Sequence, residues 1–293
     1  MTAPPPLNDI TPPWRLVVFI LASIVGVLAL RIVLPPALGL IGRATGTPVP
    51  TYAFIWTLAG GLLIGHAWTF RMVEPRGWSY VGLGRDAWRP GAIAGATLLG
   101  AAAIALPSVV LLGIGWLRIE PGPPGDPLGA AVGMLPLLVP AALWEELLLR
   151  GFAFAVVRER WGTWRALLTT SLVFGLLHLQ NAGAGVQSVV LVTLAGIFLG
   201  AILVRTGSLY AAWAAHLSWN FVMAGVLHAA VSGIGFSAPR YRLVDAGPDW
   251  ATGGPWGPEG GVFAGAAMVA SILFLLRRPA RHPEPANGTE PDA

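Results

Sequence analysis

Two adjacent carboxylates and a guanidinium interrupt an apolar stretch, LVPAALWEELLLRGFAFAVV, which runs from Leu138 to Val157. The charged side chains belong to Glu145, Glu146 and Arg150. A single charge near the middle of a bilayer-spanning helix costs roughly 2.5–3.5 kcal/mol on insertion scales. Three such residues within two helical turns therefore indicate a polar site that faces other helices rather than lipid.

More polar side chains occur on two later apolar segments. The stretch SLVFGLLHLQN contains Phe174 and His178, and AAWAAHLSWNFV contains His216 and Asn220, which share one helical face. At a rise of about 1.5 Å per residue, the glutamates, the histidines and Asn220 lie roughly 12–21 Å from the same predicted end of their helices. We therefore expect these side chains to meet at a common depth, in a shared polar pocket.

Such a pocket could hydrolyse a peptide bond without a covalent intermediate. A carboxylate and a neutral imidazole can hold and deprotonate water, while a second imidazole and an amide can donate hydrogen bonds to a developing oxyanion. Glu145, His178 and His216 could instead bind zinc, but the chain lacks the H-E-x-x-H arrangement of common zinc proteases. The metal-free version, which requires no cofactor, is favoured over a divalent metal such as zinc.

The spacing of the charged residues suggests separate roles for the two glutamates. Glu146 and Arg150 lie four residues apart with the acid first, which is the better orientation for an ion pair on a helix. Such a pair partly neutralises both charges and leaves Glu145 as the free carboxylate. The chain has no cysteine, which excludes a thiolate nucleophile, disulfides and cysteine-ligated metals.

The chain as a whole is too apolar for a water-soluble protein. Of its 293 residues, 55% are hydrophobic and 11% are charged, with a mean hydropathy of +0.68, whereas a soluble domain carries about 25% charged residues. At about 20 apolar residues per span, the sequence predicts an all-α polytopic membrane protein with about eight transmembrane helices and an intramembrane polar cavity. The predicted spans are Trp14–Leu34, Tyr52–Met72, Gly91–Leu117, Leu128–Val157, Trp164–Leu179, Val186–Val204, Leu209–Ala230 and Val262–Leu276.

The placement of arginine predicts the orientation. Arginines favour cytoplasmic loops, and here they gather in the second, fourth and sixth breaks between the predicted spans and after the last span. Both termini are therefore predicted to be cytoplasmic, in a multi-pass protein of the cell membrane. The long Gly- and Pro-rich break from Val231 to Gly261 is predicted to be an extramembrane loop. Pro-rich ends predict disordered tails at 1–13 and 279–293, on either side of one transmembrane domain, 14–278.

The polar motifs resemble the signatures of the CAAX-protease and bacteriocin-processing (CPBP, or Abi) family of intramembrane endopeptidases. This family includes the type II CAAX prenyl endopeptidase, which removes the C-terminal tripeptide of farnesylated or geranylgeranylated proteins. The resemblance covers residues 128–230, the predicted catalytic core. The three motifs follow one another on successive spans as Glu145-Glu146-x-x-x-Arg150, Phe174-x-x-x-His178 and His216-x-x-x-Asn220.

The resemblance implies a role for each matching residue. Glu145 would activate a water molecule with the help of His178, and His216 and Asn220 would form the oxyanion site. The supporting residues implied by the motifs are Glu146, Arg150 and Phe174. The implied partners are the lipid bilayer and a membrane-associated peptide or protein, with no nucleic acid, and the family analogy favours substrate access from the cytoplasmic side.

Two other functions stay open at this point. The first is a proton-coupled transporter in which Glu146, Arg150 and the histidines form a relay. The second is a non-catalytic membrane scaffold or bacteriocin-immunity protein. His66 and His228 have no partner pattern and are predicted to be structural. The lack of lysine and the abundance of Ala, Gly, Pro and Arg indicate a GC-rich bacterial genome.

Overall fold

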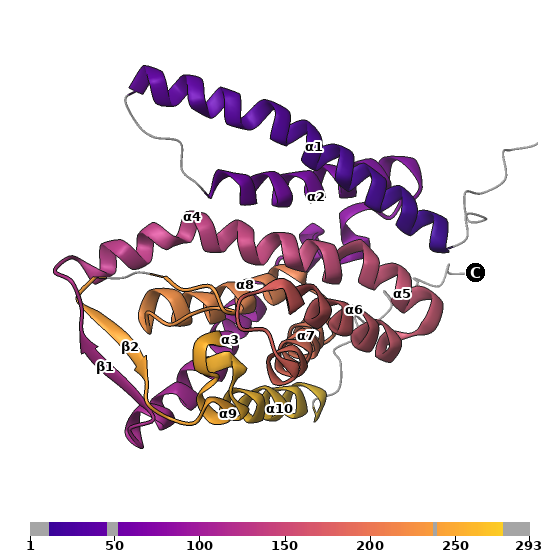
Figure 1. Ribbon diagram of the computed structural model, residues 1–293. Coiled ribbons are helices and arrows are strands. Elements are labelled where there is room, and N and C mark those ends of the chain that lie inside the picture. The colour runs from indigo at the N-terminus through magenta and orange to yellow at the C-terminus, as the bar shows by residue number, and fades with distance from the viewer. Residues whose placement is uncertain (1–11, 46–51, 237–238, 278–293) are drawn as a thin grey trace, which may run out of the picture.

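The structure is a computed structural model that describes residues 12–45, 52–236 and 239–277. The predicted tails lie outside the described residues, except that Pro12 and Pro13 begin the first helix. The chain is mostly helical, as predicted (Figure 1). Its α-helices are α1 (Pro12–Thr45), α2 (Ala53–Met72), α3 (Pro90–Gly113), α4 (Pro127–Glu146), α5 (Ala153–Trp161), α6 (Thr163–Leu177), α7 (Val186–Thr206), α8 (Leu209–Phe221), α9 (Asp249–Thr252) and α10 (Val262–Arg277).

Short non-α turns connect or extend several of these helices. Two are π-helical and continue α4 and α8, and the others are single 3-10 turns in the connections. The π-helical turns are η4 (Leu147–Phe152) and η6 (Val222–Val226), and the 3-10 turns are η2 (Gly77–Val81), η3 (Arg85–Ala87), η5 (His178–Gln180), η7 (Gly254–Trp256) and η8 (Pro258–Gly260).

Among the described residues, five apolar helical segments have the length and hydropathy to cross a membrane, so the prediction of a polytopic membrane protein is confirmed. The remaining candidates are shorter, because α6 has 15 residues, α8 has 13 and α10 has 16. The count of eight spans therefore stays a prediction. The five long segments are Trp14–Ile41, Ala53–Met72, Pro90–Gly113, Pro127–Trp161 and Val186–Thr206.

A two-stranded antiparallel sheet corrects the all-α prediction. Strand β1 (Leu117–Pro121) pairs with β2 (Tyr241–Asp245), with Leu117 opposite Asp245. Both strands lie in breaks that the sequence marks only by their Gly and Pro content. Because the partners are more than a hundred residues apart in the chain, no local pattern in either segment indicates that they pair.

Local sequence signals start the two helices that carry most of the predicted site. At the start of α4, the Asp126 carboxylate accepts hydrogen bonds from the N–H groups of Leu128 and Gly129, both at 3.0 Å. Pro127 is the first residue of α4, where a backbone N–H would have no partner within the helix, so the missing N–H of proline does not destabilise it. Ser208 begins α8 in the same way, because its hydroxyl accepts from the N–H of Ala211 at 3.3 Å.

The helix α8 lies inside the bundle, between α3 and α4. Ala211, Ala212 and Ala215 on α8 are fully buried, and small side chains allow neighbouring helices to approach closely. Gly100 of α3 faces Ala215 so closely that a Cβ at this position would meet the Ala215 carbonyl. The pair α1 and α2 covers one side of α4, while α6, α7 and α8 lie on its other side (Figure 1). The polar residues of α4 therefore face an interior formed by other helices.

A cluster of charged side chains ties together the ends of α1, α2 and α5. Glu74 accepts hydrogen bonds from Arg15 and, at 2.6 Å, from Nε of Arg76. Glu159 accepts from Arg15 at 3.0 Å, from Arg76 at 3.1 Å and from the Tyr80 hydroxyl at 2.6 Å. Burial raises the pKa of the Glu74 carboxyl, but hydrogen bonds from Arg76 and the charges of Arg15 and Arg76 lower it by more, so its pKa lies below the usual 4.5.

This cluster predicts an acid-sensitive contribution to stability. A carboxyl group whose pKa is lower in the folded state stabilises the fold above its unfolded pKa, and this stabilisation is lost as the pH falls through the folded pKa. We expect Glu74→Gln to lower the unfolding free energy in detergent at pH 7 by about 1–3 kcal/mol, because Arg15 and Arg76 each lose a charged partner. The difference between Glu74→Gln and the unmodified protein should shrink as the pH falls below 4.5.

Glu120→Gln is the matched control, because Glu120 pairs with Arg242 at the surface, where the two side chains are 43% and 67% exposed. Exposed pairs contribute about 0–1 kcal/mol, so thermal unfolding of this variant should follow the unmodified protein closely. Equal stability of the two variants at neutral pH would contradict the role given to Glu74.

Candidate active site

The two neighbouring glutamates of α4 lie in different surroundings. The Glu145 side chain is 20% exposed and lines a cavity, whereas the Glu146 side chain is completely buried behind the cavity wall. Adjacent residues on a helix project about 100° apart, which is why one carboxylate can be wet and the other dry. The sequence predicted separate roles for the two glutamates, with Glu145 as the free carboxylate.

Glu146 is the centre of a buried polar network. Its Oε1 atom accepts a hydrogen bond from Arg150 at 3.1 Å, so the predicted ion pair is present. The same Oε1 lies 2.9 Å from Nδ1 of His216, a contact that was not predicted. Arg150 also donates to the carbonyl of Gly196 on α7 at 3.1 Å. The network therefore joins three separate helical segments.

A π-helical turn sets the direction of Arg150. Within η4, Gly151 has non-helical backbone angles of φ −77° and ψ −124°, which interrupts the regular hydrogen bonding of the helix. The freed N–H of Phe152 is accepted by Nε2 of His66 at 3.2 Å, and Nδ1 of His66 lies 2.8 Å from the carbonyl of Leu62. Because a carbonyl only accepts, Nδ1 carries the proton and both ring nitrogens of His66 are used. These contacts support the predicted structural role of His66.

His178 points into the cavity from the end of α6. Its Nδ1 atom lies 2.8 Å from the carbonyl of Phe174, one turn earlier, so Nδ1 carries the proton. In the neutral ring, Nε2 is then left as an acceptor. The Phe174 ring packs edge-on against His178, with ring centres 4.7 Å apart, and its face lies 4.3 Å from the guanidinium of Arg150. Phe174 thus separates the buried arginine from the imidazole.

His216 and Asn220 reach the cavity from α8. With Nδ1 directed at Glu146, the Nε2 atom of His216 faces the other way and lies 3.7 Å from Oε2 of Glu145. The two glutamates therefore flank one imidazole, the buried one by a hydrogen bond and the other at a longer distance. Asn220 lies one turn further along the same face and is 8% exposed, lining the same cavity.

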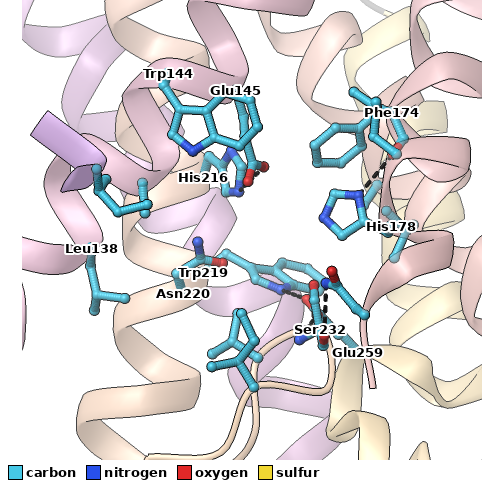
Figure 2. A pocket seen from close by; sticks show the side chains of 18 of the residues that line it. Leu138, Trp144, Glu145, Phe174, His178, His216, Trp219, Asn220, Ser232 and Glu259 are labelled. Carbon is cyan, nitrogen blue, oxygen red and sulfur yellow. Dashed lines mark hydrogen bonds and ion pairs between the residues drawn. The ribbon is translucent and has the colours of Figure 1, made fainter. Parts of the chain in front are cut away.

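These residues surround a cavity of about 530 Å³. Glu145, Phe174, His178, His216 and Asn220 all line it, while Glu146 and Arg150 lie behind its wall. Figure 2 shows Glu145 beside the His216 ring, with His178 on the opposite side of the cavity. The rest of the lining is mainly apolar and aromatic, including Leu138, Trp144 and Trp219.

Several further polar groups of the cavity wall were not predicted from the sequence, among them those of Trp219, Ser232 and Glu259. Glu259 accepts hydrogen bonds from Nε1 of Trp219 at 2.8 Å and from the N–H and hydroxyl of Ser232, both at 2.7 Å. Ser232 and Glu259 belong to the segment between α8 and α10, which was predicted to be an extramembrane loop. Part of this segment folds against the site and buries Trp256 and Glu259. The sequence did not predict this packing, because the segment is rich in Gly and Pro and its apolar residues show no helical period.

The residues predicted for the metal alternative are Glu145, His178 and His216, and the structure does not gather them into one group. Nowhere in the ranges 12–45, 52–236 and 239–277 do three histidine or acidic side chains gather closely enough to hold a metal ion. Glu145 and His216 approach each other, but they do not form such a group with His178. The metal-free chemistry stays a prediction, and the proposal below uses only the side chains of the protein.

Taken together, the fold and the site define a polytopic helical membrane protein with an acid and two imidazoles on one internal cavity. Residues 127–222, about a third of the chain, match the family model described as "Rce1-like: Type II CAAX prenyl endopeptidase Rce1-like". This segment is an Rce1-like domain of the CPBP (Abi) family, which confirms the resemblance inferred from the motifs. No curated protein and no solved structure matches the chain.

The contact between His66 and the π-helical turn generates a prediction about stability. In His66→Ala the buried N–H of Phe152 loses its acceptor, which costs about 1–3 kcal/mol in addition to the cavity that is left. We expect a lower unfolding temperature in detergent for this variant. His66→Gln, which retains a side-chain acceptor, should recover part of the loss.

Thr69→Ala is the matched control, since Thr69 is equally buried on α2 but bonds only within its own helix, to the carbonyl of Gly65 at 2.7 Å. Its loss should be clearly smaller than that of His66→Ala. If the two alanine variants unfold at the same temperature, His66 does not support the turn.

Proposed function

We propose that the protein is an intramembrane endopeptidase that hydrolyses a peptide bond of a membrane-associated substrate. The observation that carries this proposal is the convergence of Glu145, His178, His216 and Asn220 on one cavity from three helical segments. The match of residues 127–222 to an endopeptidase family supports the same reaction. The apolar lining of the cavity supports a substrate with apolar residues around the cleaved bond.

In this proposal Glu145 is the general base. A water molecule held between the Glu145 carboxylate and Nε2 of His178 donates one hydrogen bond to each. Nδ1 of His178 donates a hydrogen bond to the Phe174 carbonyl, which supports this role because Nε2 is left as the acceptor. The water oxygen attacks the carbonyl carbon of the substrate while Glu145 takes the proton.

His216 and Asn220 stabilise the oxyanion that forms. The side-chain amide of Asn220 donates directly, and Nε2 of His216 donates when the ring carries both protons. The Glu146 carboxylate, which accepts from Nδ1 at 2.9 Å, supports that doubly protonated ring by its charge. Donors fixed in advance around a developing charge are typically the largest single contribution to such a reaction.

The second half of the reaction returns the enzyme to its starting state. The tetrahedral intermediate collapses as its oxyanion reforms the carbonyl and the carbon–nitrogen bond breaks. Glu145 passes the proton that it took from water to the departing amine. The products are a new carboxylate and a new amine, and no covalent bond to the enzyme is formed. Arg150 remains behind the wall, where it fixes the position of Glu146.

The substrate range includes prenylated CAAX-type peptides as one candidate. The name of the matched family describes a prenyl endopeptidase, and an apolar cavity of about 530 Å³ suits a lipid chain or apolar side chains equally. Cleavage of farnesylated and unmodified forms of one peptide by the purified protein separates these two cases.

The proposed role of Glu145 as general base predicts the effect of replacing it. Glu145→Gln keeps the shape of the side chain but removes proton acceptance, so we expect peptide cleavage to fall by about 10²–10⁴-fold. The variant should remain folded, because Glu145 makes no hydrogen bond to the described residues and faces the cavity. Cleavage is measured with a quenched fluorescent peptide in detergent or liposomes.

Glu120→Gln is again a suitable control, as it removes an exposed carboxylate of the sheet that does not line the cavity. Its cleavage rate should equal that of the unmodified protein. Full activity of Glu145→Gln would rule out this mechanism.

The second prediction concerns metals. Because the described histidine and acidic residues do not form a metal-binding group, we expect cleavage to survive dialysis against a strong chelator. A loss of activity that added zinc restores would show that the proposed metal-free chemistry is wrong. Glu145→Gln should stay inactive whether or not zinc is added.

A further inference from the structure

The described residues divide their charges very unevenly between the two ends of the helical bundle. At one end lie the start of α1, the connections α2–α3, α5–α6 and α7–α8, and the end of α10. We call this the arginine-rich end, since it carries ten arginines and only three acidic residues, Glu74, Asp86 and Glu159. Its arginines are Arg15, Arg71, Arg76, Arg85, Arg89, Arg158, Arg160, Arg165, Arg205 and Arg277.

The opposite end contains the strands β1 and β2, and we call it the sheet end. Its described residues include four arginines but five acidic residues, so its charge is slightly negative. Excess arginine marks the cytoplasmic side of a membrane protein. The difference between the ends therefore assigns the sheet end to the extracytoplasmic side. The charged residues of this end are Arg43, Arg118, Arg240, Arg242, Glu120, Asp126, Asp245, Asp249 and Glu259.

The cavity extends from Glu145 toward the sheet end. On α4 its lining continues from Glu145 back to Leu137, and on α2 it includes Phe54 in the first turn. Asn181, after α6, and the loop residues from Val231 to Phe236 also line it. All of these groups lie on the side of Glu145 that faces β1 and β2.

On the other side of Glu145, the lining continues only to Phe198 and Leu199 of α7, which are 1% and 4% exposed, and packed side chains close the bundle beyond them. Glu146 and Arg150 have no exposed side-chain surface, and Leu147, Phe152 and Phe154 are at most 1% exposed. No cavity-lining residue of α4 and its continuation lies beyond Leu149. A substrate approaching from the arginine-rich end would have to break this packing, including the buried ion pair.

Apolar side chains are exposed where the cavity reaches the sheet end. Phe54 is 52% exposed and Ile234 is 57% exposed, and both line the cavity. They come from two separate segments of the chain. A rim of this kind suits an apolar segment that slides in from the membrane surface, rather than a charged, freely diffusing peptide.

We propose that the cavity opens on the extracytoplasmic side, and that the substrate is an exported, membrane-anchored peptide with apolar residues around the cleaved bond. The substrate part of this inference rests on the proposed peptidase function. The side on which the cavity opens does not depend on that function. It differs from the access side expected from the family analogy. Prenylated proteins of the cytoplasm could not reach a cavity that opens in this direction.

The lack of cysteine makes the side of opening directly measurable. Gly235 lies between two lining residues, Ile234 and Phe236, and a Cβ added there would meet nothing within 4 Å. Gly91, at the arginine-rich end, is also exposed and equally open to a Cβ. Gly235→Cys and Gly91→Cys are therefore a matched pair that should fold like the unmodified protein.

The pair is treated with a charged, membrane-impermeant maleimide in intact bacterial spheroplasts and again after lysis. We expect Gly235→Cys to be labelled in intact spheroplasts, and Gly91→Cys only after lysis. The reverse pattern, or labelling of both only after lysis, would overturn the proposal. Leu98→Cys, at a 71% exposed position in the middle of α3, should resist labelling in both cases and reports on membrane integrity.

A second measurement links the opening to catalysis. After labelling with a bulky maleimide, Gly235→Cys should lose cleavage of an apolar quenched fluorescent peptide, whereas labelled Gly91→Cys should retain it. Unchanged cleavage by labelled Gly235→Cys would mean that the substrate enters elsewhere and would overturn the proposal. If neither variant cleaves any peptide before labelling, the peptidase function fails, and the labelling pattern still decides the side of opening.

Discussion

A buried guanidinium imposes the main constraint on this fold. Arg150 has no exposed side-chain surface, so its charge must be met inside the protein, and Glu146 and the carbonyl of Gly196 meet it. Removing one partner of such a buried pair typically costs about 3–5 kcal/mol, because the other charge is left uncompensated. Since Glu146 also bonds His216, satisfying Arg150 fixes the relative positions of α4, α7 and α8. The geometry of the cavity wall follows from that requirement.

The parts that hold this network extend well beyond the segment that matches the endopeptidase family. The π-helical turn that directs Arg150 inward depends on His66 of α2, and a Cβ at Gly151 would collide with that ring, at 2.6 Å from Nε2. On the opposite side of the cavity, Glu259 fixes both Trp219 and Ser232. Both supports lie outside residues 127–222. The matched segment therefore contains the candidate catalytic residues, while the first helices and the last loop hold them in position.

Much of the candidate site could be predicted because charged and polar residues stand out in apolar helices. The four-residue spacings of Glu146 with Arg150 and of His216 with Asn220 imply that each pair lies on one face of its helix. The predicted depth of His178 in the membrane is similar to theirs, which predicts that it lies near them. The bond between Glu146 and His216 could not be predicted, since spacing within one helix says nothing about rotation against another. The β1–β2 pairing and the packing of Glu259 could not be predicted for a similar reason. They join segments that are distant in the chain and have no period.

The unequal surroundings of the two glutamates explain how one site can be both charged and wet inside a membrane. Electrostatic attraction between Glu146, Arg150 and His216 is strong only where water is excluded, because the effective dielectric constant is low there. The proposed hydrolysis, in contrast, requires water beside Glu145. Both conditions hold only if the packed layer of Leu147 and Phe152 seals one side of the network while the cavity opens on the other. A site open at both ends would weaken the network that positions His216, so access from a single side follows from the electrostatics of the site.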